Sequence, residues 1–410
     1  MLYPCPVSAV SVSIRVLYSG EEQMKRMTGS DHHTVMIAKQ VRVWLLLLFL
    51  GLPADGAGQG KVYTTADGIR FKVETVLTGL DVPWSIVFDK AGNMYFTERA
   101  GRLNVLRKGE RKPLLISDVE DVVSQGEGGL MGLALHPDFE SNHLLYVSHT
   151  YRLKDGLANK VVRFRLENWG LKDRKVIVNY LPGSPVHNGC RLRFGPDGKL
   201  YVTTGDAARR AIAQDPVQLG GKILRLNDDG SIPGDNPDPS SPVYALGVRN
   251  PQGIDWDPVS GVLVETEHGP SGFDGPGGGD EVNLIQKGGN YGWPLVHHRD
   301  RKEGYSSPIL EYTPAVAPAS GVFYDGSGFK QMKGNFLFGC LRGTRIQRVV
   351  FDSSDRRKVK MEEALLMGEY GRIREVAVGP EGDIYFSTSN TSRGRPTLDD
   401  DRIMKMVPLR

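Results

Sequence analysis

The chain has 410 residues, of which 24% are charged and 40% hydrophobic, so it can form a large folded core. Its 50 glycines and 25 prolines follow no three-residue period and lie between apolar runs, which excludes collagen and favours a folded chain with many turns. The formal net charge is only +3, with no long basic block, so no nucleic-acid partner is expected, and three cysteines cannot form a disulfide framework or a four-thiolate zinc site.

The first part of the chain has the pattern of an export signal. Lys39 and Arg42 precede an apolar stretch at 43–52, and small, turn-prone residues follow at 53–57. This apolar stretch is too short to span a bilayer core of about 30 Å. We therefore expect residues 1–57 to be a signal peptide with an upstream extension, the mature protein to be periplasmic or secreted, and no stable membrane insertion after cleavage. An uncleaved anchor or a buried helix is the alternative.

From residue 61 onward the sequence repeats one theme: an apolar run, a turn rich in Pro, Asp and Gly, and a second apolar run containing Tyr or Phe. Six copies lie at 84–96, 130–147, 191–202, 253–264, 320–339 and 375–386. About fifty residues per copy is the length of a four-stranded propeller blade, and no long stretch has a helical apolar period. The sequence predicts an all-β fold, a six-bladed β-propeller with four-stranded antiparallel blades, as a single domain over residues 61–410.

The strand-like runs at the two ends of this domain, 71–77 and 402–407, are expected to pair within one blade. Such pairing would close the ring and remove its open edge. A two-sheet sandwich is the alternative fold, but it would need two separate domains.

The segment 187–206 is the first candidate for chemistry. It reads as a hairpin with its turn near residues 196–198, and antiparallel pairing about that turn places His187 opposite Asp206. A carboxylate beside an imidazole fixes its tautomer and raises its basicity, as a general base requires. A structural His–Asp pair that closes the hairpin is the alternative.

Two further candidate segments follow. Arg249 and Asn250 precede Pro251, which favours an extended turn that presents both side chains, although a surface ion pair of Arg249 is the alternative. The glycine-rich segment 265–283 lets carbonyl oxygens converge near Asp and Glu side chains, which suits a hard cation such as Ca²⁺ better than zinc. A phosphate-binding loop would need a following helix and a Gly-Lys-Ser/Thr pattern, and a flexible loop is the remaining alternative.

Three arginines late in the chain form the last candidate. Arg372 and Arg374 point to the same side of a strand, and Arg342 lies in an earlier segment. Neighbouring guanidinium groups repel one another unless an anion lies between them, and each matches a carboxylate with two hydrogen bonds. A ligand with several carboxylates is therefore expected, with solvated surface arginines as the alternative.

Together these segments resemble the soluble quinoprotein glucose/sorbosone dehydrogenases, also called aldose sugar dehydrogenases, over residues 71–407. The motifs that carry the resemblance occur in the family's order: GEGGLMG at 126–132, HPDF at 136–139, the hairpin described above, RNPQG at 249–253, EHGP at 267–270, DEVN at 280–283 and GNYGWP at 289–294. The resemblance implies a six-bladed propeller that binds pyrroloquinoline quinone (PQQ) and Ca²⁺, oxidises a sugar, and passes electrons to an external acceptor.

The resemblance also implies roles for the catalytic residues. His187 would take the proton of the anomeric hydroxyl while a hydride passes to the quinone C5, and Asp206 would orient His187. Arg249 would stabilise negative charge developing on the quinone oxygen. The carbonyls of Gly269 and Pro270 would hold the Ca²⁺ that polarises the same oxygen.

Further matches concern the binding of the cofactor and a second ion. The three late arginines match positions that bind the cofactor's carboxylates, and Asn250 matches one that contacts PQQ. Glu281 and the carbonyl of Tyr291 match a second, structural calcium site in some members of the family.

The sequence departs from the family's pattern at four positions. Glu127 stands at a cofactor-contacting position where glucose-oxidising members have Gln, and an anionic carboxylate there would repel a tricarboxylate unless it is protonated or paired. Val186 replaces an Asp that precedes the base in some members, which weakens the case for glucose itself. Cys190 and Cys340 replace Gly and Ser, and we expect two free thiols rather than a disulfide bridge.

Two other functions on the same architecture stay open. A non-catalytic propeller would bind a protein or a glycan on its top face, but such a face has no need of buried guanidinium groups. A calcium-dependent lactonase would need several side-chain carboxylates around a central ion, where this sequence offers mainly carbonyls and arginines.

Overall fold

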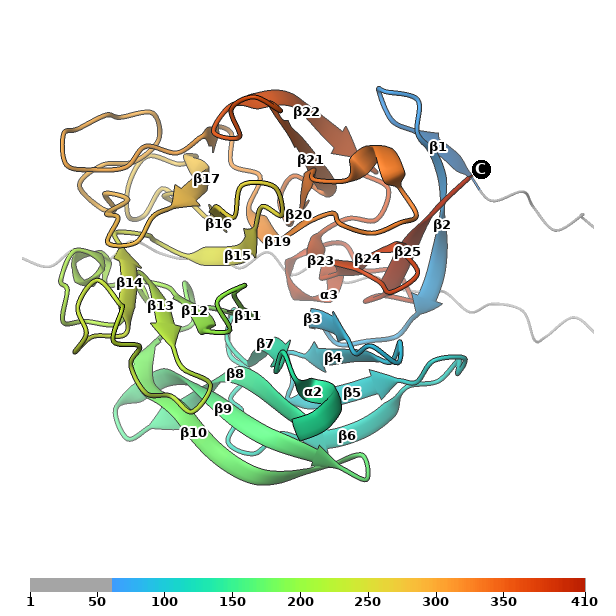
Figure 1. The fold of residues 1–410 in the computed structure, drawn as a ribbon, viewed down its shortest axis with the longest axis horizontal. Coiled ribbons are helices and arrows are strands. Elements are labelled where there is room, and N and C mark those ends of the chain that lie inside the picture. Colours follow the sequence, from blue (N-terminus) through green and yellow to red (C-terminus); the bar gives the residue numbers. More distant parts are fainter. Residues whose placement is uncertain (1–60, 410) are drawn as a thin grey trace, which may run out of the picture. The chain divides into compact units, whose positions relative to one another are not determined.

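The computed structural model describes residues 61–409, and within this range the strands form six antiparallel sheets around a central axis (Figure 1). Each sheet is one blade of a β-propeller, so the six-bladed fold predicted from the six repeats is confirmed. The predicted signal peptide at 1–57 lies outside the described residues.

The strands of the first five blades run in chain order from the centre to the rim. Blade 1 contains β3 (Pro83–Phe88), β4 (Met94–Glu98), β5 (Arg102–Leu106) and β6 (Leu114–Asp118). Blade 2 contains β7 (Leu130–Leu135), β8 (Leu144–Leu153), β9 (Gly156–Glu167) and β10 (Gly170–Gly183). Blade 3 contains β11 (Gly189–Phe194), β12 (Leu200–Thr204), β13 (Lys222–Leu226) and β14 (Val243–Leu246). Blade 4 contains β15 (Pro251–Trp256), β16 (Leu263–Glu267), β17 (Asp280–Ile285) and β18 (Leu310–Tyr312). Blade 5 contains β19 (Pro318–Phe323), β20 (Phe336–Cys340), β21 (Arg345–Phe351) and β22 (Val359–Leu365).

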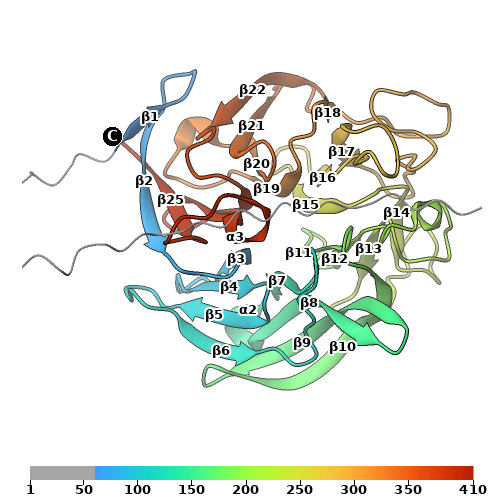
Figure 2. The same cartoon turned by 180° about the vertical axis from the view of Figure 1, so that it is seen from behind.

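Blade 6 joins the two ends of the domain. Its strands from the centre outward are β23 (Ile373–Val378), β24 (Ile384–Thr388), β25 (Ile403–Pro408), β2 (Arg70–Leu77) and β1 (Val62–Thr64). Strand β2 pairs antiparallel with β25, and the two lie side by side in both views (Figures 1 and 2). The predicted pairing of 71–77 with 402–407 is confirmed, while β1 is a fifth strand that the repeats did not predict.

The helices of the described residues are short. They are α2 (Phe139–Asn142), α3 (Asn390–Arg393) and the 3₁₀ turns η1 (Arg210–Ala213) and η2 (Lys330–Met332). Within residues 61–409, no helix has the length and apolar character needed to cross a membrane.

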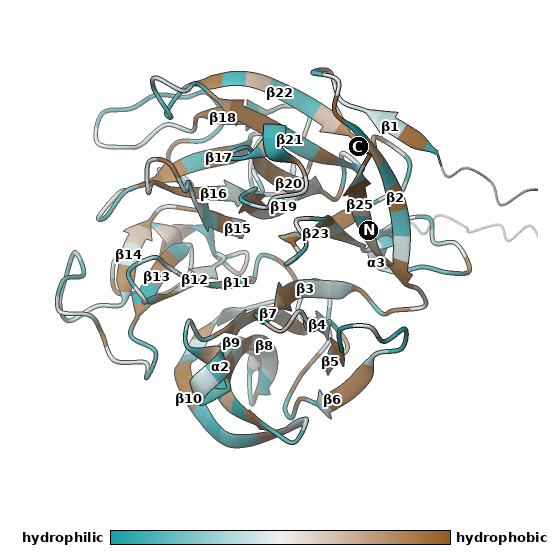
Figure 3. Cartoon of the chain, turned by 45° about the vertical axis from the view of Figure 1, so that its right-hand side comes forward, coloured by the Kyte–Doolittle hydropathy of each residue, from teal (hydrophilic) through white to brown (hydrophobic). Residues whose placement is uncertain are grey.

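The hydrophobic core lies between the blades. Six buried apolar clusters each join two neighbouring blades, one at every blade–blade contact around the ring. In one of them, Tyr95 and Leu103 of blade 1 pack with Leu133 and Val147 of blade 2. On the rim, partly buried and exposed residues alternate along most of β22, as in a strand with one exposed face, and the strand carries both hydrophilic and hydrophobic residues (Figure 3). Each blade is thus held on both sides, which gives the loops at the ends of the strands a firm frame.

The six predicted hairpins are the first two strands of the six blades. The innermost strands β3, β7, β11, β15, β19 and β23 contact one another in a closed ring. Because the two strands of a hairpin are antiparallel, the segment that enters the inner strand lies beside the segment that leaves the second one. The loops at this end of the blades therefore gather around one opening of the central channel.

The two cysteines of the described residues lie in the inner part of the propeller. Cys190 in β11 and Cys340 in β20 are buried and free, so the expected free thiols are confirmed. Burial raises the pKa of each thiol to about 12, which keeps both protonated at neutral pH.

Candidate active site

A cavity of about 260 Å³ lies at this opening of the channel, slightly smaller than the usual small-molecule site of about 300–1000 Å³. All six blades contribute to its wall through their inner strands or the loops beside them, including Trp84, Met131, Gly189, Gln252, Ala317 and Arg374. The predicted site residues that line it are Glu127, His187, Arg249, Gly269, Pro270, Arg342, Arg372 and Arg374. Residues far apart in the sequence therefore meet in one site.

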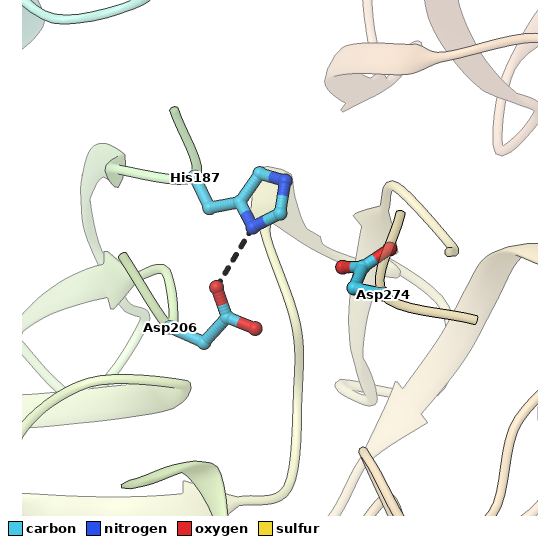
Figure 4. A group of neighbouring side chains, drawn as sticks. All are labelled: His187, Asp206 and Asp274. Atoms are coloured by element: carbon cyan, nitrogen blue, oxygen red, sulfur yellow. Dashed lines mark hydrogen bonds and ion pairs between the residues drawn. The ribbon is translucent and has the colours of Figure 1, made fainter. Parts of the chain in front are cut away.

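His187 and Asp206 form the predicted pair. Nδ1 of His187 lies 2.8 Å from Oδ1 of Asp206, and both side chains are buried (Figure 4). Gly189 at the start of β11 pairs with Thr204 at the end of β12, so the register predicted from the turn is confirmed. When Nδ1–H donates to the carboxylate, Nε2 is left as an acceptor on a ring that lines the cavity.

The backbone around this pair is tightly constrained. His187 has a φ of 56°, which is uncommon for a residue other than glycine and is often found at functional sites. A Cβ at position 205 would overlap the carbonyl oxygen of His187, so only Gly205 lets the ends of the hairpin approach this closely. Oδ1 of Asp206 also accepts the N–H of Ala208, and Oδ2 accepts the indole N–H of Trp293, each at 2.8 Å. Three donors thus fix the carboxylate that orients His187.

Arg249 is buried and held by the loop that follows β16. Its Nε donates to Oδ2 of Asp274 at 2.8 Å, and Nη2 lies 2.7 Å from the same oxygen. Nη1 donates to the carbonyl of His268 and Nη2 to Oγ of Ser271, both at 3.0 Å. A guanidinium has five N–H groups, so one N–H on Nη1 is left for a ligand in the cavity. The alternative of a surface ion pair is wrong, because the pair is buried.

Five other arginines line the same cavity: Arg99, Arg342, Arg372, Arg374 and Arg393. Arg374 is buried, its Nη1 donates to Gln252 at 2.8 Å, and burial together with the neighbouring Arg372 lowers its pKa to about 9. The Nε groups of Arg372 and Arg374 have no hydrogen-bond partner among the described residues. The cluster therefore combines positive charge with unsatisfied donors, which suits an anionic ligand.

Glu127 lies among these arginines. Its Oε2 accepts the N–H of His187 at 3.0 Å, and its Oε1 lies 3.4 Å from Nη1 of Arg393. Burial disfavours the charge of Glu127, but His268, the His187 N–H and Arg393 outweigh burial and hold the pKa of Glu127 below its ordinary value. Glu127 is thus an anion that is paired with Arg393. This pairing reduces the repulsion that an anionic ligand beside Glu127 would meet.

The glycine-rich segment brings oxygen atoms together, as its composition predicted. A Cβ at Gly269 would overlap the carbonyl oxygens of Gly278 and Gly279, so only glycine fits between them. The N–H of Gly269 donates to Oδ1 of Asp280 at 2.9 Å, and Asp280 lines the cavity. Carbonyl and carboxylate oxygens are the ligands that Ca²⁺ prefers.

Glu281 and Tyr291 line a separate, small cavity next to the first, together with Glu267. The side-chain amide of Asn283 lies 3.2 Å from a carboxylate oxygen of each of Glu265, Glu267 and Glu281. Burial raises the pKa of Glu267 to about 7. Burial and the nearby Glu267 also raise the pKa of Glu265 and of Glu281 well above the ordinary range. The backbone N–H of Arg249 also donates to Oε2 of Glu267. These neutral donors cannot compensate three buried carboxylates, so this cluster favours a cation.

Asn250, a predicted cofactor contact, does not line the cavity. It is buried, its Oδ1 accepts the N–H of Gly189 at 3.1 Å, and its Nδ2 has no partner among the described residues. Its contact with a cofactor stays a prediction.

Several residues of the site were not singled out from the sequence. Trp293 lies in the GNYGWP motif and Asp274 in the glycine-rich segment 265–283. Nothing in their spacing indicated that Trp293 would donate to Asp206 or that Asp274 would pair with Arg249. Arg99 directly follows β4, and Arg393 is the last residue of α3. Amino-acid composition at these two places did not indicate a binding site.

Known proteins are similar to this chain over most of its length. The family model of the glucose/sorbosone dehydrogenases matches residues 80–395. The aldose sugar dehydrogenase YliI of Escherichia coli is 32% identical over 345 residues, which cover 78% of this chain and 90% of YliI.

Solved structures are similar as well. A Thermus thermophilus oxidoreductase of the glucose dehydrogenase type is 40% identical with a TM-score of 0.75, over 82% of this chain and 100% of the other. The PQQ-bound aldose sugar dehydrogenase of Streptomyces coelicolor is 32% identical with a TM-score of 0.73, over 83% of this chain and 98% of the other.

Proposed function

The chain belongs to the glucose/sorbosone dehydrogenase family, and on this basis we propose that it is a PQQ- and calcium-dependent dehydrogenase that oxidises the anomeric hydroxyl of an aldose to the lactone. The observation that carries the proposal is the buried His187–Asp206 pair beside arginines with unsatisfied donors in one cavity. The pair supplies a base, and the arginines supply a site for an anionic cofactor, which are the two parts that this reaction needs.

The residues of the cavity fit PQQ, a flat molecule with three carboxylates. Arg342, Arg372 and Arg374 would hold these carboxylates, and the two unpartnered Nε groups would gain acceptors. A buried donor without a partner costs about 1–3 kcal/mol, so binding removes a penalty that the free protein carries. When bound, PQQ supplies a two-electron acceptor for the hydride that leaves the anomeric carbon.

The residues also fit calcium. The carbonyls of Gly269 and Pro270 would hold one ion beside the cofactor, where it would act as a Lewis acid. Glu281 and the carbonyl of Tyr291 would hold a second ion. The unpaired buried carboxylates around Glu281 support this assignment, because a divalent cation would compensate their charge.

In the proposed reaction, the chain's own residues move the proton and orient the groups. Nε2 of His187 accepts the proton of the anomeric hydroxyl, while the electron pair of the C1–H bond leaves with the hydride. Asp206 keeps the Nδ1 tautomer in place and stabilises the imidazolium that forms. Arg249 offers its remaining N–H to the oxygen on which negative charge develops.

We propose that the substrate is a small sugar, that an external molecule reoxidises the cofactor, and that the protein is exported. The signal-like pattern at 39–57 supports export, and N-terminal sequencing of the mature protein tests it. A mature protein that still begins upstream of residue 43 would contradict cleavage of this segment.

Reconstitution of the purified mature chain with PQQ and Ca²⁺ tests the function. Turnover of one or more sugars in a panel, with an artificial electron acceptor, is the expected result. His187→Ala should lose turnover while it still binds PQQ in calorimetry. If the wild-type protein shows no turnover and leaves the absorbance spectrum of PQQ unaltered, the non-catalytic propeller that binds a protein or a glycan is the better description.

A further inference from the structure

The loop that follows Pro270 contacts both candidate catalytic residues. Phe273 stacks on the imidazole of His187, with ring centroids 5.8 Å apart and planes 22° apart. Asp274, the next residue, forms the ion pair with Arg249. Figure 4 shows Asp274 facing His187 and Asp206 from a different segment of the chain, and one nitrogen or oxygen atom of each of the three lies within 4.8 Å of the others.

Neither Phe273 nor Asp274 lines the cavity, whereas His187 and Arg249 do. The two loop residues therefore contact the catalytic side chains without forming part of the cavity wall. Phe273 is 67% exposed although it is a large apolar side chain, so burial of its own surface does not explain its position. Its stacking on His187 is the aromatic contact that it makes among the described residues.

The loop has a defined conformation of its own. The N–H of Ser271 donates to Oδ1 of Asp274 at 2.9 Å, and the N–H of Gly272 donates to the carbonyl of Gly275 at 3.1 Å. Nη1 of Arg210, in the 3₁₀ turn of blade 3, donates to the carbonyl of Asp274 at 3.0 Å. The loop is thus tied to the blade that carries His187 as well as to the blade that carries Arg249.

Charge balance gives Asp274 a second role. Its carboxylate lies close to that of Asp206, and two unpaired carboxylates at this distance would repel each other. Arg249 compensates Asp274 directly, since two of its nitrogens contact the same oxygen of Asp274. Asp274 in turn fixes the guanidinium plane and so fixes the direction of the one N–H left for a ligand.

We propose that Phe273 and Asp274 are positioning residues for His187 and Arg249: Phe273 holds the ring plane of His187, and Asp274 holds the guanidinium of Arg249. The inference rests on the proposed function for its effect on turnover, but the positioning itself is a property of the protein without cofactor. Errors of about 1 Å in the placement of such groups cost on the order of 100-fold in rate.

Four variants test the proposal. Asp274→Ala should lower kcat by about 100-fold and Phe273→Ala by about 10-fold, with KM changed less than about threefold, because neither residue lines the cavity. Asp274→Glu and Phe273→Tyr should restore much of the loss, since the carboxylate and the aromatic face are kept. Asp238→Asn, in an exposed turn of blade 3, is the matched control with wild-type kinetics.

Nuclear magnetic resonance of the protein without cofactor gives a second readout. The ring-current shift of the His187 ring protons should disappear in Phe273→Ala and persist in Phe273→Tyr. The slowly exchanging Nε–H signal of Arg249 should broaden or vanish in Asp274→Ala and persist in Asp274→Glu. Labelled histidine and arginine, with His187→Gln and Arg249→Lys to assign the signals, make both measurements feasible.

The outcomes separate this proposal from the proposed function. If both signals survive the alanine substitutions, the positioning roles are wrong whatever the turnover. If the wild-type protein is inactive but the signals change as expected, the sugar dehydrogenase function fails and the positioning stands. Wild-type kcat in folded Asp274→Ala and Phe273→Ala proteins, with melting temperatures unchanged, would overturn the catalytic importance of the loop.

Discussion

The indole Nε1 of Trp293 lies 2.8 Å from Oδ2 of Asp206, the carboxylate whose other oxygen orients His187. The same indole lies beside the guanidinium of Arg249, whose Cζ is 5.3 Å from the ring centroid. Trp293→Phe keeps most of the packing but removes the donor to Asp206, so kcat should fall by about 10-fold. Steady-state kinetics check this, with Trp256→Phe as a control that lies outside the site. An unchanged kcat would show that Asp206 does not need this donor.

Replacement of Asp206 by Asn should have a larger effect. The amide can offer an N–H to Nδ1 of His187, which moves the ring proton to Nε2 and removes the acceptor that faces the cavity. We expect kcat to fall by about 100-fold or more, while the affinity for PQQ changes little because Asp206 does not line the cavity. Calorimetry of PQQ binding beside steady-state kinetics separates the two effects. A parallel loss of affinity would mean that the substitution disturbs the whole site.

The sequence predicted those features of the fold and site that follow from the pairing of neighbouring strands. The pairing of His187 with Asp206 follows from one hairpin and its turn, and the ring closure follows from two strand-like ends. Contacts between loops of different blades could not be predicted from strand patterns or turn positions. The approach of Arg393 to Glu127 depends on where the short helix α3 and the loop before β7 lie, and neither position follows from a residue periodicity.

The glycine-rich segment shows the same limit. Its composition predicted converging oxygens, and Gly269 bears this out. Composition could not indicate that its middle turns Phe273 toward His187 and Asp274 toward Arg249, because that depends on turn geometry within the loop and on the anchor from Arg210.

Glu127 should weaken the binding of an anionic cofactor. Its carboxylate is ionised and paired with Arg393 and the His187 N–H, so its negative charge remains in the cavity at neutral pH. Glu127→Gln keeps the shape and an acceptor for the N–H, and it should tighten PQQ binding by about 10-fold at low salt, with a smaller gain at high salt. Calorimetry at two ionic strengths measures this. A weaker affinity in Glu127→Gln would mean that the carboxylate organises Arg393 for binding.

The buried charge of Arg374 should destabilise the cofactor-free protein and stabilise the complex of the protein with PQQ. Burial and the charge of Arg372 lower its pKa to about 9, which shows that its charge is unfavourable in the empty site. Arg374→Gln should therefore raise the melting temperature of the cofactor-free protein slightly and weaken PQQ binding by about 10- to 100-fold. Thermal melts and calorimetry give the two results, and Arg395→Gln, in an exposed loop, is the control. A lower melting temperature together with unchanged affinity would assign Arg374 a structural role instead.

The buried carboxylates around Glu267 predict how stability depends on pH and calcium. The pKa of Glu267 is raised to about 7 in the folded protein, against about 4.3 for an unperturbed Glu. The folded state therefore binds more protons than the unfolded state between about pH 4 and pH 7, and in this window stability falls as pH rises.

In EDTA, the melting temperature should consequently fall by several degrees between about pH 5 and pH 8, and Glu267→Gln should reduce this fall. Calcium added at about pH 8 should restore the lost stability, because the ionised carboxylates bind it, whereas magnesium should do so less well. Glu281→Gln should remove most of the calcium effect, since Glu281 is the proposed ligand. If calcium leaves the melting temperature of the wild-type protein unchanged at every pH, the second ion site is wrong and these carboxylates stay protonated instead.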